Sequence, residues 1–470
     1  MKSNRERFND HSGGIQTHTS NSVHAYNECL HILNGDIDVI HGDIVGRKGY
    51  KLVSTVDTFQ IQGMFIYRYS NVKTYVVMYD NGVNAQIVKS NAPDFSGFWT
   101  PVRILTTGHE VFLENFVGKA FIFNGFDTVK STSDFSTYTT VTNAPSVGKF
   151  PFVLNQALHV VSEGGVLYSS DVVNATGLDF TSTVWTSRGI NPNDGQKVTY
   201  ALRFGGRGVI FKEESIYRYD GTNEPEATIN VGTHSWRSVI VGADSKMLFH
   251  HPSGIYEMFI GNPELISFPV QKFIEGMDSE NWSKVVANKS QNKDYFWIGD
   301  VTINNVLYFD YGKTYKNVVL VWNIFTRKWT VYSGLDMKHA FYDESTQRSY
   351  FGDSFGNINE INVGYSDNGK AINFEILPFP INTGYPEKIK NYGRIYMLGS
   401  LQGQGFSAGS YEELFSNNDN RSELQNGVIA MTNGIDSRQL WVAYNESYVD
   451  TPPRFSELIV ENIDITDDAH

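Results

Sequence analysis

The amino-acid sequence predicts an all-β protein, and three observations lead to that fold class. Of the 470 residues, 14% are aromatic and 42 are glycine, a composition that favours strands joined by turns. Short runs of Val, Ile, Tyr, Phe and Trp recur along the chain, each bounded by Gly, Asn, Asp or Ser. Only residues 273–283 indicate a short helix.

The clearest strand pattern lies between Tyr308 and Gly369. Its four apolar runs cover residues 318–325, 328–332, 340–342 and 348–351. Gly352 and Gly356 then turn the chain back as a further strand. This spacing predicts one antiparallel, four-stranded sheet with a tryptophan near its middle.

A unit of strand, turn and strand recurs along the chain. It starts at Gln62, Val111, Lys149, Val198, Trp236, Lys284 and Met337, at intervals of 49, 38, 49, 38, 48 and 53 residues. A period of about 40 to 50 residues with several short strands is typical of a β-propeller, whose closed ring buries faces that one sheet would expose. A β-sandwich also has many short strands, but it does not require this period. We therefore predict a six- or seven-bladed β-propeller with long loop insertions and a small C-terminal antiparallel β unit.

Three segments follow from this pattern. Residues 1–34 are polar and aperiodic, which predicts an N-terminal arm that is flexible or is ordered by assembly. Residues 35–365 form the predicted propeller, and residues 366–470 form a β unit packed on it or an elaborated last blade. Residues 131–146 and 172–196 are rich in Thr, Ser, Asn and Asp, so we expect long surface loops there.

The C-terminal unit has its own pattern. Two strands joined through Pro-Phe-Pro and Thr-Gly-Tyr-Pro precede a loop rich in Gly, Ser and Asn over residues 402–422. A hairpin-like region follows and ends in the strand ELIVENIDI, residues 457–465. The acidic tail after it is expected to be exposed.

Charge and cysteine content limit the function classes. The formal charge is −13, from 51 acidic and 38 basic residues, so the folded body should repel nucleic acid. The single cysteine, Cys29, excludes an internal disulfide framework and leaves the redox compartment undecided. No apolar run approaches the roughly 18 residues of a membrane span, and the N-terminal residues lack the pattern of a secretory signal. We therefore expect synthesis in the cytoplasm and no membrane insertion.

The sequence presents no catalytic constellation. Its acidic pairs are Asp36/Asp38, Glu213/Glu214 and Asp467/Asp468. Neighbouring residues on a strand point to opposite faces, so we interpret these pairs as solvated surface. For the same reason, the adjacent His250 and His251 cannot face one metal ion. HExxH and P-loop motifs are absent from the sequence, and we expect no catalytic residue, no cofactor and no metal site.

Two glycine clusters are interpreted as backbone features. Gly403, Gly405 and Gly409 lack the spacing and the following helix of a phosphate-binding loop, so we expect a mobile loop. Gly205, Gly206 and Gly208 indicate a hairpin turn. The stretch STSDFSTYT, residues 131–139, has the Ser and Asp of a sialidase Asp box but not its Gly and Trp.

Several stretches taken together resemble a known family, the β-propeller nozzle proteins of short-tailed bacteriophages, which are also called tail accessory or stabilisation proteins. Arg47 and Gly49 match the Arg-Pro-Gly turn that opens the family's first strand, with Lys48 in place of the proline. The likeness continues through VLYSSDVVNATGLDF, VIFKEESIYRYDG, VWNIFTRKWTVYSG, FGDSFGNINEIN and YSDNGKAINFEI. It covers most of residues 25–398 and rests on the order of these stretches.

The resemblance implies a structural role in the virion tail. Proteins of this family form a ring, usually a hexamer, below the portal and adaptor proteins. They extend the channel through which genomic DNA leaves and support tail fibres or spikes. Six copies would carry a formal charge of about −78, and an acidic lumen would let DNA slide without specific binding. We expect the acidic loops at residues 127–134 and 171–194 to include surface that faces the lumen or another subunit.

Two other functions are compatible with a propeller. An interaction module for proteins or glycans needs only the repeats, and a basic or aromatic face would favour it. A glycoside hydrolase should display convergent acids with Arg or Tyr partners, which the sequence does not indicate.

Overall fold

The structure is a computed structural model. It describes residues 5–17, 25, 27–38, 40–171, 185–259, 261–303, 313–381, 389–401, 405–409, 424–425, 428–431, 435–437 and 440–465. Strands dominate these residues. The helical elements are α1 (Gln271–Glu275) and the 3-10 turns η1 (Trp236–Ser238), η2 (Phe268–Val270) and η3 (Ser279–Lys284). The short helix expected at residues 273–283 is thus present as the end of α1 followed by η3. None of the helices described has the length and apolarity needed to cross a membrane.

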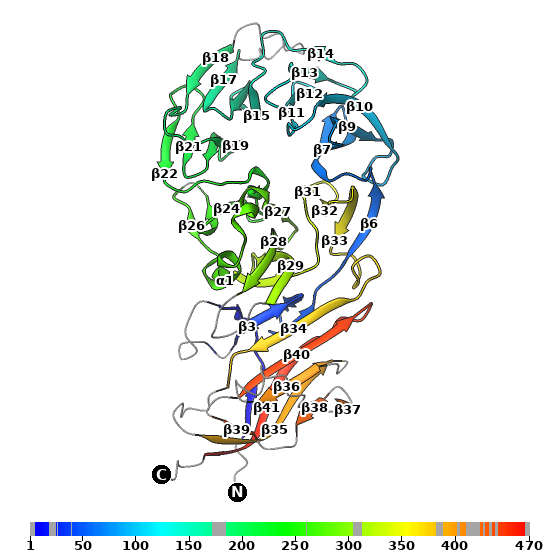
Figure 1. Ribbon diagram of the computed structural model, residues 1–470, viewed down its shortest axis with the longest axis vertical. Coiled ribbons are helices and arrows are strands. Elements are labelled where there is room, and N and C mark those ends of the chain that lie inside the picture. Colours follow the sequence, from blue (N-terminus) through cyan, green and yellow to red (C-terminus); the bar gives the residue numbers. More distant parts are fainter. Residues whose placement is uncertain are drawn as a thin grey trace.

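A ring of antiparallel four-stranded units forms the upper part of the molecule (Figure 1). The first three sheets are β7 (Ile61–Tyr69), β8 (Val72–Asp80), β9 (Asn84–Ser90), β10 (Trp99–Thr106); β11 (Phe112–Phe116), β12 (Lys119–Phe123), β13 (Lys130–Thr132), β14 (Thr139–Thr140); and β15 (Gly148–Leu154), β16 (Ala157–Ser162), β17 (Val166–Ser170), β18 (Trp185–Gly189). The next two are β19 (Val198–Phe204), β20 (Arg207–Lys212), β21 (Ile216–Tyr219), β22 (Glu226–Ile229); and β23 (Ile240–Val241), β24 (Met247–His251), β25 (Gly254–Met258), β26 (Glu264–Leu265).

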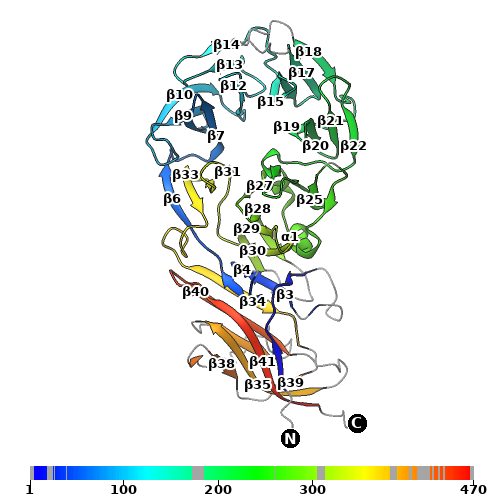
Figure 2. The same cartoon turned by 180° about the vertical axis from the view of Figure 1, so that it is seen from behind.

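Two further units complete the ring (Figure 2). One is β27 (Val286–Lys289), β28 (Lys293–Ile303), β29 (Lys313–Asn323) and β30 (Lys328–Tyr332), the start of a larger sheet. The other is β31 (His339–Asp343), β32 (Arg348–Gly352), β33 (Asn357–Ile361) and β6 (Tyr50–Thr55). This arrangement of four-stranded meanders around an axis is a β-propeller, so the predicted fold class is confirmed.

The predicted repeat positions coincide with the innermost strands. The units expected at Gln62, Val111, Lys149 and Val198 begin within one residue of β7, β11, β15 and β19. Those at Trp236, Lys284 and Met337 begin within four residues of β23, β27 and β31. Buried apolar side chains of neighbouring sheets pack together in each gap. The repeat was visible in the sequence because every sheet must bury both faces.

The ring closes through an N-terminal strand. β6 pairs with β33, from Tyr50 opposite Ile361 to Thr55 opposite Asn357. The last sheet also contacts the first through Asp343, which is 1% exposed and accepts a hydrogen bond of 3.0 Å from the hydroxyl of Tyr75. Closure therefore joins segments from opposite ends of the propeller sequence.

One sheet prediction was wrong. The four runs between residues 318 and 351 do not form a single sheet, because β29 and β30 belong to one sheet and β31 and β32 to the next. Residues 333–338 carry the chain from the outer strand of one sheet to the inner strand of its neighbour. Sequence spacing does not distinguish this crossing from a hairpin turn.

The lower part of the molecule is a β unit built from both ends of the chain (Figure 1). The sheet that begins with β27–β30 continues through β3 (Glu28–Leu33), β34 (Ile372–Pro378), β40 (Trp441–Tyr448) and β36 (Gly405–Gly409), and β2 (Gly14–Ile15) pairs with β3. An eight-stranded sheet contains β37 (Leu424–Gln425), β38 (Val428–Met431), β35 (Lys390–Ser400), β41 (Arg454–Ile465), β5 (Ile44–Gly46) and β4 (Gly35–Ile37), with β1 (Arg5–Phe8) beside β41 and β39 (Ile435–Ser437) beside β35. The ring and the lower unit thus share a continuous sheet.

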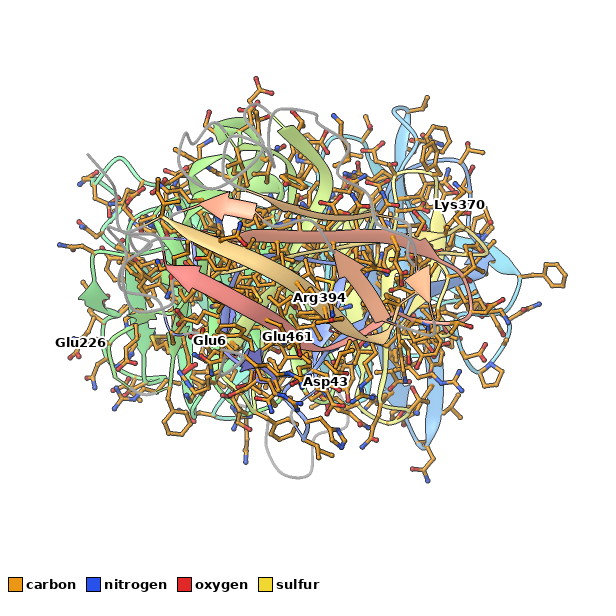
Figure 3. All side chains as sticks on the ribbon, turned by 90° about the horizontal axis from the view of Figure 1, so that it is seen from below. Glu6, Asp43, Glu226, Lys370, Arg394 and Glu461 are labelled. Carbon is orange, nitrogen blue, oxygen red and sulfur yellow. The ribbon has the colours of Figure 1, made fainter. Side chains whose placement is uncertain are left out.

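Strand pairing crosses the segment boundaries drawn from the sequence. Where an N-terminal arm is predicted, β1 pairs with β41, and Arg5 forms an ion pair of 3.2 Å with Glu461. Figure 3 shows Glu6, Glu461 and Arg394 on the neighbouring strands β1, β41 and β35. Residues 29–33 of β3 are buried. The arm is therefore held, in its described residues, by the C-terminal strands of the same chain.

Local expectations in glycine-rich and polar segments had mixed outcomes. The turn at Gly205 and Gly206 is confirmed, since both have positive φ between β19 and β20. The expected mobile loop at Gly405–Gly409 is wrong, because these residues form β36 against β40. Gly403 lies outside the described residues. The long loops expected at 131–146 and 172–196 each contain a strand, β14 and β18, while residues 172–184 lie outside the described part.

Candidate functional site at the closure of the ring

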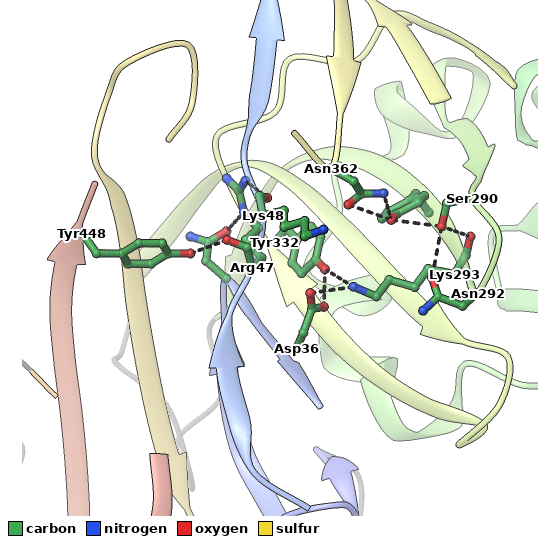
Figure 4. A network of polar contacts seen from close by, with 11 residues as sticks. Asp36, Arg47, Lys48, Ser290, Asn292, Lys293, Tyr332, Asn362 and Tyr448 are labelled. Atoms are coloured by element: carbon green, nitrogen blue, oxygen red, sulfur yellow. Dashed lines mark hydrogen bonds and ion pairs between the residues drawn. The ribbon is translucent and has the colours of Figure 1, made fainter. Parts of the chain in front are cut away.

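A largely buried polar cluster lies where the ring closes and the lower unit begins (Figure 4). We call it the closure clamp and define it as Asn34, Asp36, Arg47, Lys293, Tyr332 and Asp367. The first three come from the N-terminal segment, Lys293 and Tyr332 from β28 and β30, and Asp367 from the link between β33 and β34. The clamp therefore joins three parts of the chain that are distant in sequence.

Arg47 forms the first half of the closure clamp. Its side chain is buried, and its guanidinium makes two hydrogen bonds to the Asp367 carboxylate, of 2.9 and 2.6 Å. Nε donates to Oδ1 of Asn34 at 2.8 Å. The remaining donors reach the carbonyl oxygens of Lys48 at 3.0 Å and Ser333 at 3.2 Å. All five N–H donors of the guanidinium are thus satisfied, as a buried arginine requires.

The backbone around Arg47 is fixed as well. The Tyr448 hydroxyl on β40 donates to the carbonyl oxygen of Arg47 at 2.7 Å. Asn34 has a positive φ of 55°, and its Nδ2 donates to the carbonyl oxygen of Asn373 at 2.6 Å. Burial opposes the charged form of Arg47, but the Asp367 carboxylate outweighs burial and leaves the arginine pKa raised. Arg47 is therefore charged across the whole accessible pH range.

Asp36 and Lys293 form the second half of the closure clamp. Lys293 Nζ lies 2.5 Å from Asp36 Oδ2, and the Tyr332 hydroxyl donates to the other carboxylate oxygen (Figure 4). Burial lowers the pKa of Lys293, but Asp36 more than compensates and the net pKa is raised. Burial and the neighbouring Asp36 also raise the pKa of Tyr332 well above its usual value. Lys293 is thus charged and the phenol is neutral.

A polar pocket of about 530 Å³ opens beside the second half of the clamp. It is lined by Asp36, Lys48, Asn292, Lys293 and Asn362, among other residues. The buried charges here already pair with one another, so the arrangement is suited to holding segments together rather than to proton transfer.

The residues singled out in the sequence have different places in the structure. Arg47 and Gly49, which carry the family resemblance, lie at the closure clamp, and Lys48 lines the adjacent pocket. Asp36 is not solvated surface, because its side chain is only 22% exposed and is ion-paired. Asp38 points elsewhere, to His41 at 3.1 Å and to Arg454. The two acids therefore do not converge on one site. Asp36 is largely buried because it pairs with Lys293, which is distant in sequence.

The histidine pair and the other acids also separate. His250 is fully buried, and burial lowers its pKa to about 3. His251 lies 3.0 Å from Glu214, which also contacts His234 at 3.2 Å. Among the described residues, no group of three or more His, Cys, Asp or Glu side chains is placed to hold a metal ion. Asp467 and Asp468 lie outside the described residues.

The acidic loops contain local turn contacts. Asp127 accepts hydrogen bonds from the backbone and hydroxyl of Thr106, at 2.8 and 2.7 Å. Asp134, in the stretch compared with an Asp box, accepts from the backbone of Ser136 and Thr137. Asp194 forms an ion pair of 2.7 Å with buried Lys212. These acids stabilise turns and joints of the propeller.

Gly49, two residues after Arg47, has little room for a side chain. A Cβ added there would lie 1.9 Å from the carbonyl oxygen of Ser366. We predict that Gly49→Ala lowers the free energy of unfolding by about 1–3 kcal/mol, because the two backbone segments must separate. Gly164→Ala is the control, since its Cβ would meet nothing closer than 4.0 Å. Urea titrations of both variants would refute the prediction if their midpoints were equal.

Comparisons with known proteins add little beyond the fold. The chain matches no protein-family model, and no curated protein shows significant similarity. Among solved structures it is similar to YCF48 from Cyanidioschyzon merolae, at 10% identity and a TM-score of 0.44, over 66% of this chain and 98% of that one. It is also similar to BamB from Moraxella catarrhalis, at 10% identity and a TM-score of 0.40, over 64% and 82% of the two chains. The Pan2 WD40 domain of Neurospora crassa gives 6% identity and a TM-score of 0.41, over 67% and 95%.

Proposed function

We propose that this chain is a structural protein of a virion tail, a nozzle subunit that forms a hexameric ring below portal and adaptor proteins. The observation that carries the proposal is the closure clamp. It fastens the ring to a lower unit in which strands from both chain ends interleave, through buried ion pairs and a shared sheet. A joint of this kind suits a part that must transmit force between neighbouring proteins. The resemblance at Arg47, Gly49 and the later stretches supports the same role.

In this proposal DNA passes between copies and not along the axis of one propeller. The Trp236 ring lies against rings from other sheets, with centroid distances of 4.8 Å to Phe112 and 5.6 Å to His339. These contacts leave no room for a duplex within one ring. An acidic lumen formed by several copies would repel DNA and keep it from binding, in line with the charge of −13 per chain.

Quantitative mass spectrometry of purified particles tests the proposal. We expect about six copies of this chain per particle, counted against a capsid protein of known copy number. Tail fibre or spike proteins should remain attached when the tails are separated from the heads. If the chain is absent from particles, the nozzle role is wrong, and a propeller interaction module becomes the better description.

A further inference from the structure

A small cavity lies at the axis of the propeller, beside Trp236. Its volume is about 230 Å³. The residues that line it come mainly from strands near the axis and from the segment after β22. Most of the lining is apolar, including Met64, Met78, Val111 and Ala340. Aromatic rings complete the lining, from Phe112, Tyr200 and Trp236 among others. A cavity of this size accommodates one aromatic ring, whereas drug-sized ligands occupy about 300–1,000 Å³.

Arg237 and His339 contribute polar side chains to the cavity lining. Arg237 is 11% exposed, and its terminal nitrogen lies 2.7 Å from Glu110. Its Nε, however, has no hydrogen-bond partner in the described part of the chain. His339 is 7% exposed, and its Nδ1 also lacks a partner there. Native interiors rarely leave such atoms unpaired, so both call for a ligand or water.

The polar groups around the cavity favour a ligand with an acceptor oxygen. Glu110 is shared by Arg237 and by Lys149, which lies 3.4 Å away, so two cations face one carboxylate at this point. Lys149 also contacts Glu163 at 2.6 Å, but that carboxylate is 53% exposed. Burial, with Arg237 nearby, lowers the pKa of His339 to about 3, so the imidazole is neutral. A buried Nε–H can only donate, and its partner must therefore be an acceptor oxygen.

We propose that this cavity binds a small aromatic carboxylate. The ring of the ligand packs beside the rings of Phe112, Trp236 and His339, since Trp236 already contacts the other two. A carboxylate oxygen of the ligand accepts the hydrogen bond from Arg237 Nε. Offset and edge-to-face packing against these rings is favourable for an aromatic guest and less so for an aliphatic one. The site is separate from the closure clamp and independent of the proposed assembly.

Binding of 4-fluorobenzoate to the full chain, followed by ¹⁹F NMR, tests the proposal. We expect saturable binding with a Kd of about 1 mM or tighter. In protein labelled with ¹³C-methyl methionine, the shifts should change at Met64 and Met78. Fluorobenzene, which lacks the carboxylate, should bind at least about tenfold more weakly. Absence of saturable binding, or shifts confined to other methionines, would overturn the proposal.

Two variants locate the ligand. Ala340→Leu fills the cavity and should reduce 4-fluorobenzoate affinity at least about tenfold, whereas Ala92→Leu, which is not among the lining residues, should leave it unchanged. Arg237→Lys keeps the charge but removes Nε, so it should weaken 4-fluorobenzoate and not fluorobenzene. Equal effects on the two ligands would show that the carboxylate is not recognised. Should Ala340→Leu fail to fold, the methionine shifts of the unmodified protein still decide the question.

Discussion

Replacing Asp367 with alanine is expected to lower the free energy of unfolding by about 3–5 kcal/mol. The substitution leaves the Arg47 guanidinium, 1% exposed, without its ion partner in the protein interior. A charge in that position can regain water only if the joint between ring and lower unit opens. Urea unfolding followed by circular dichroism measures the loss. The first transition is the relevant one, because a chain of several sheets need not unfold in one step.

An ion pair on the sheet of β31–β33 and β6 provides the matched control. Arg348 and Glu360 lie 3.6 Å apart, but the Arg348 side chain is 56% exposed. Glu360→Ala should therefore cost no more than about 1 kcal/mol. The double variant Arg47→Met with Asp367→Leu should recover part of the loss, since no lone charge remains buried. Equal costs for Asp367→Ala and Glu360→Ala would contradict the structural importance of the closure clamp.

The clamp also shows which parts of a propeller can be predicted from sequence. Each inner strand belongs to a sheet that must bury both faces, so the same apolar pattern recurs in the sequence. The positions of β7, β11, β15 and β19 were therefore predicted within one residue. Arg47 and Asp367, by contrast, are 320 residues apart, and neither has a local motif that names its partner. Only the family resemblance drew attention to Arg47. Long-range polar pairs form only when the ring closes. Sequence periodicity predicts the ring, but it does not indicate which distant residues pair within it.

The errors have a common physical cause. The β29–β30 and β31–β32 hairpins were assigned to one sheet because a crossing between blades and a tight turn use the same residue types. Residues 405–409 were expected to lie in a mobile loop because the stretch 402–422 is rich in Gly, Ser and Asn, yet they pair with β40 along their whole length. Pairing with a distant strand overrode the local preference. Strands drawn from both chain ends make such long-range pairing the main feature of the lower unit.

The second large effect on stability is expected from a buried carboxyl group that lies between two sheets of the propeller. Asp294 on β28 is fully buried. Its Oδ2 lies close to the backbone of Gly242, only 2.9 Å from the position that a Cβ on that glycine would occupy. Burial raises the pKa of Asp294 to about 7, and the carboxylates of Asp244 and Glu257 act in the same direction. Lys289 and the backbone N–H of Ala243 oppose the shift without cancelling it. At neutral pH the folded protein therefore holds this carboxyl group partly protonated.

Asp294→Asn is expected to stabilise the protein above pH 7 and to have little effect near pH 4. In the unfolded chain Asp294 ionises near pH 3.8, whereas in the folded protein it ionises near pH 7. Between these values only the unfolded state releases the proton, so the stability of the natural sequence falls as pH rises. The penalty is complete above pH 7 and amounts to at most about 4 kcal/mol, since each pKa unit corresponds to about 1.4 kcal/mol. Urea midpoints at pH 4, 6 and 8 for both proteins measure it. The amide and the protonated acid have the same shape, so the substitution should change packing little. A stability difference that does not grow with pH would therefore contradict the prediction.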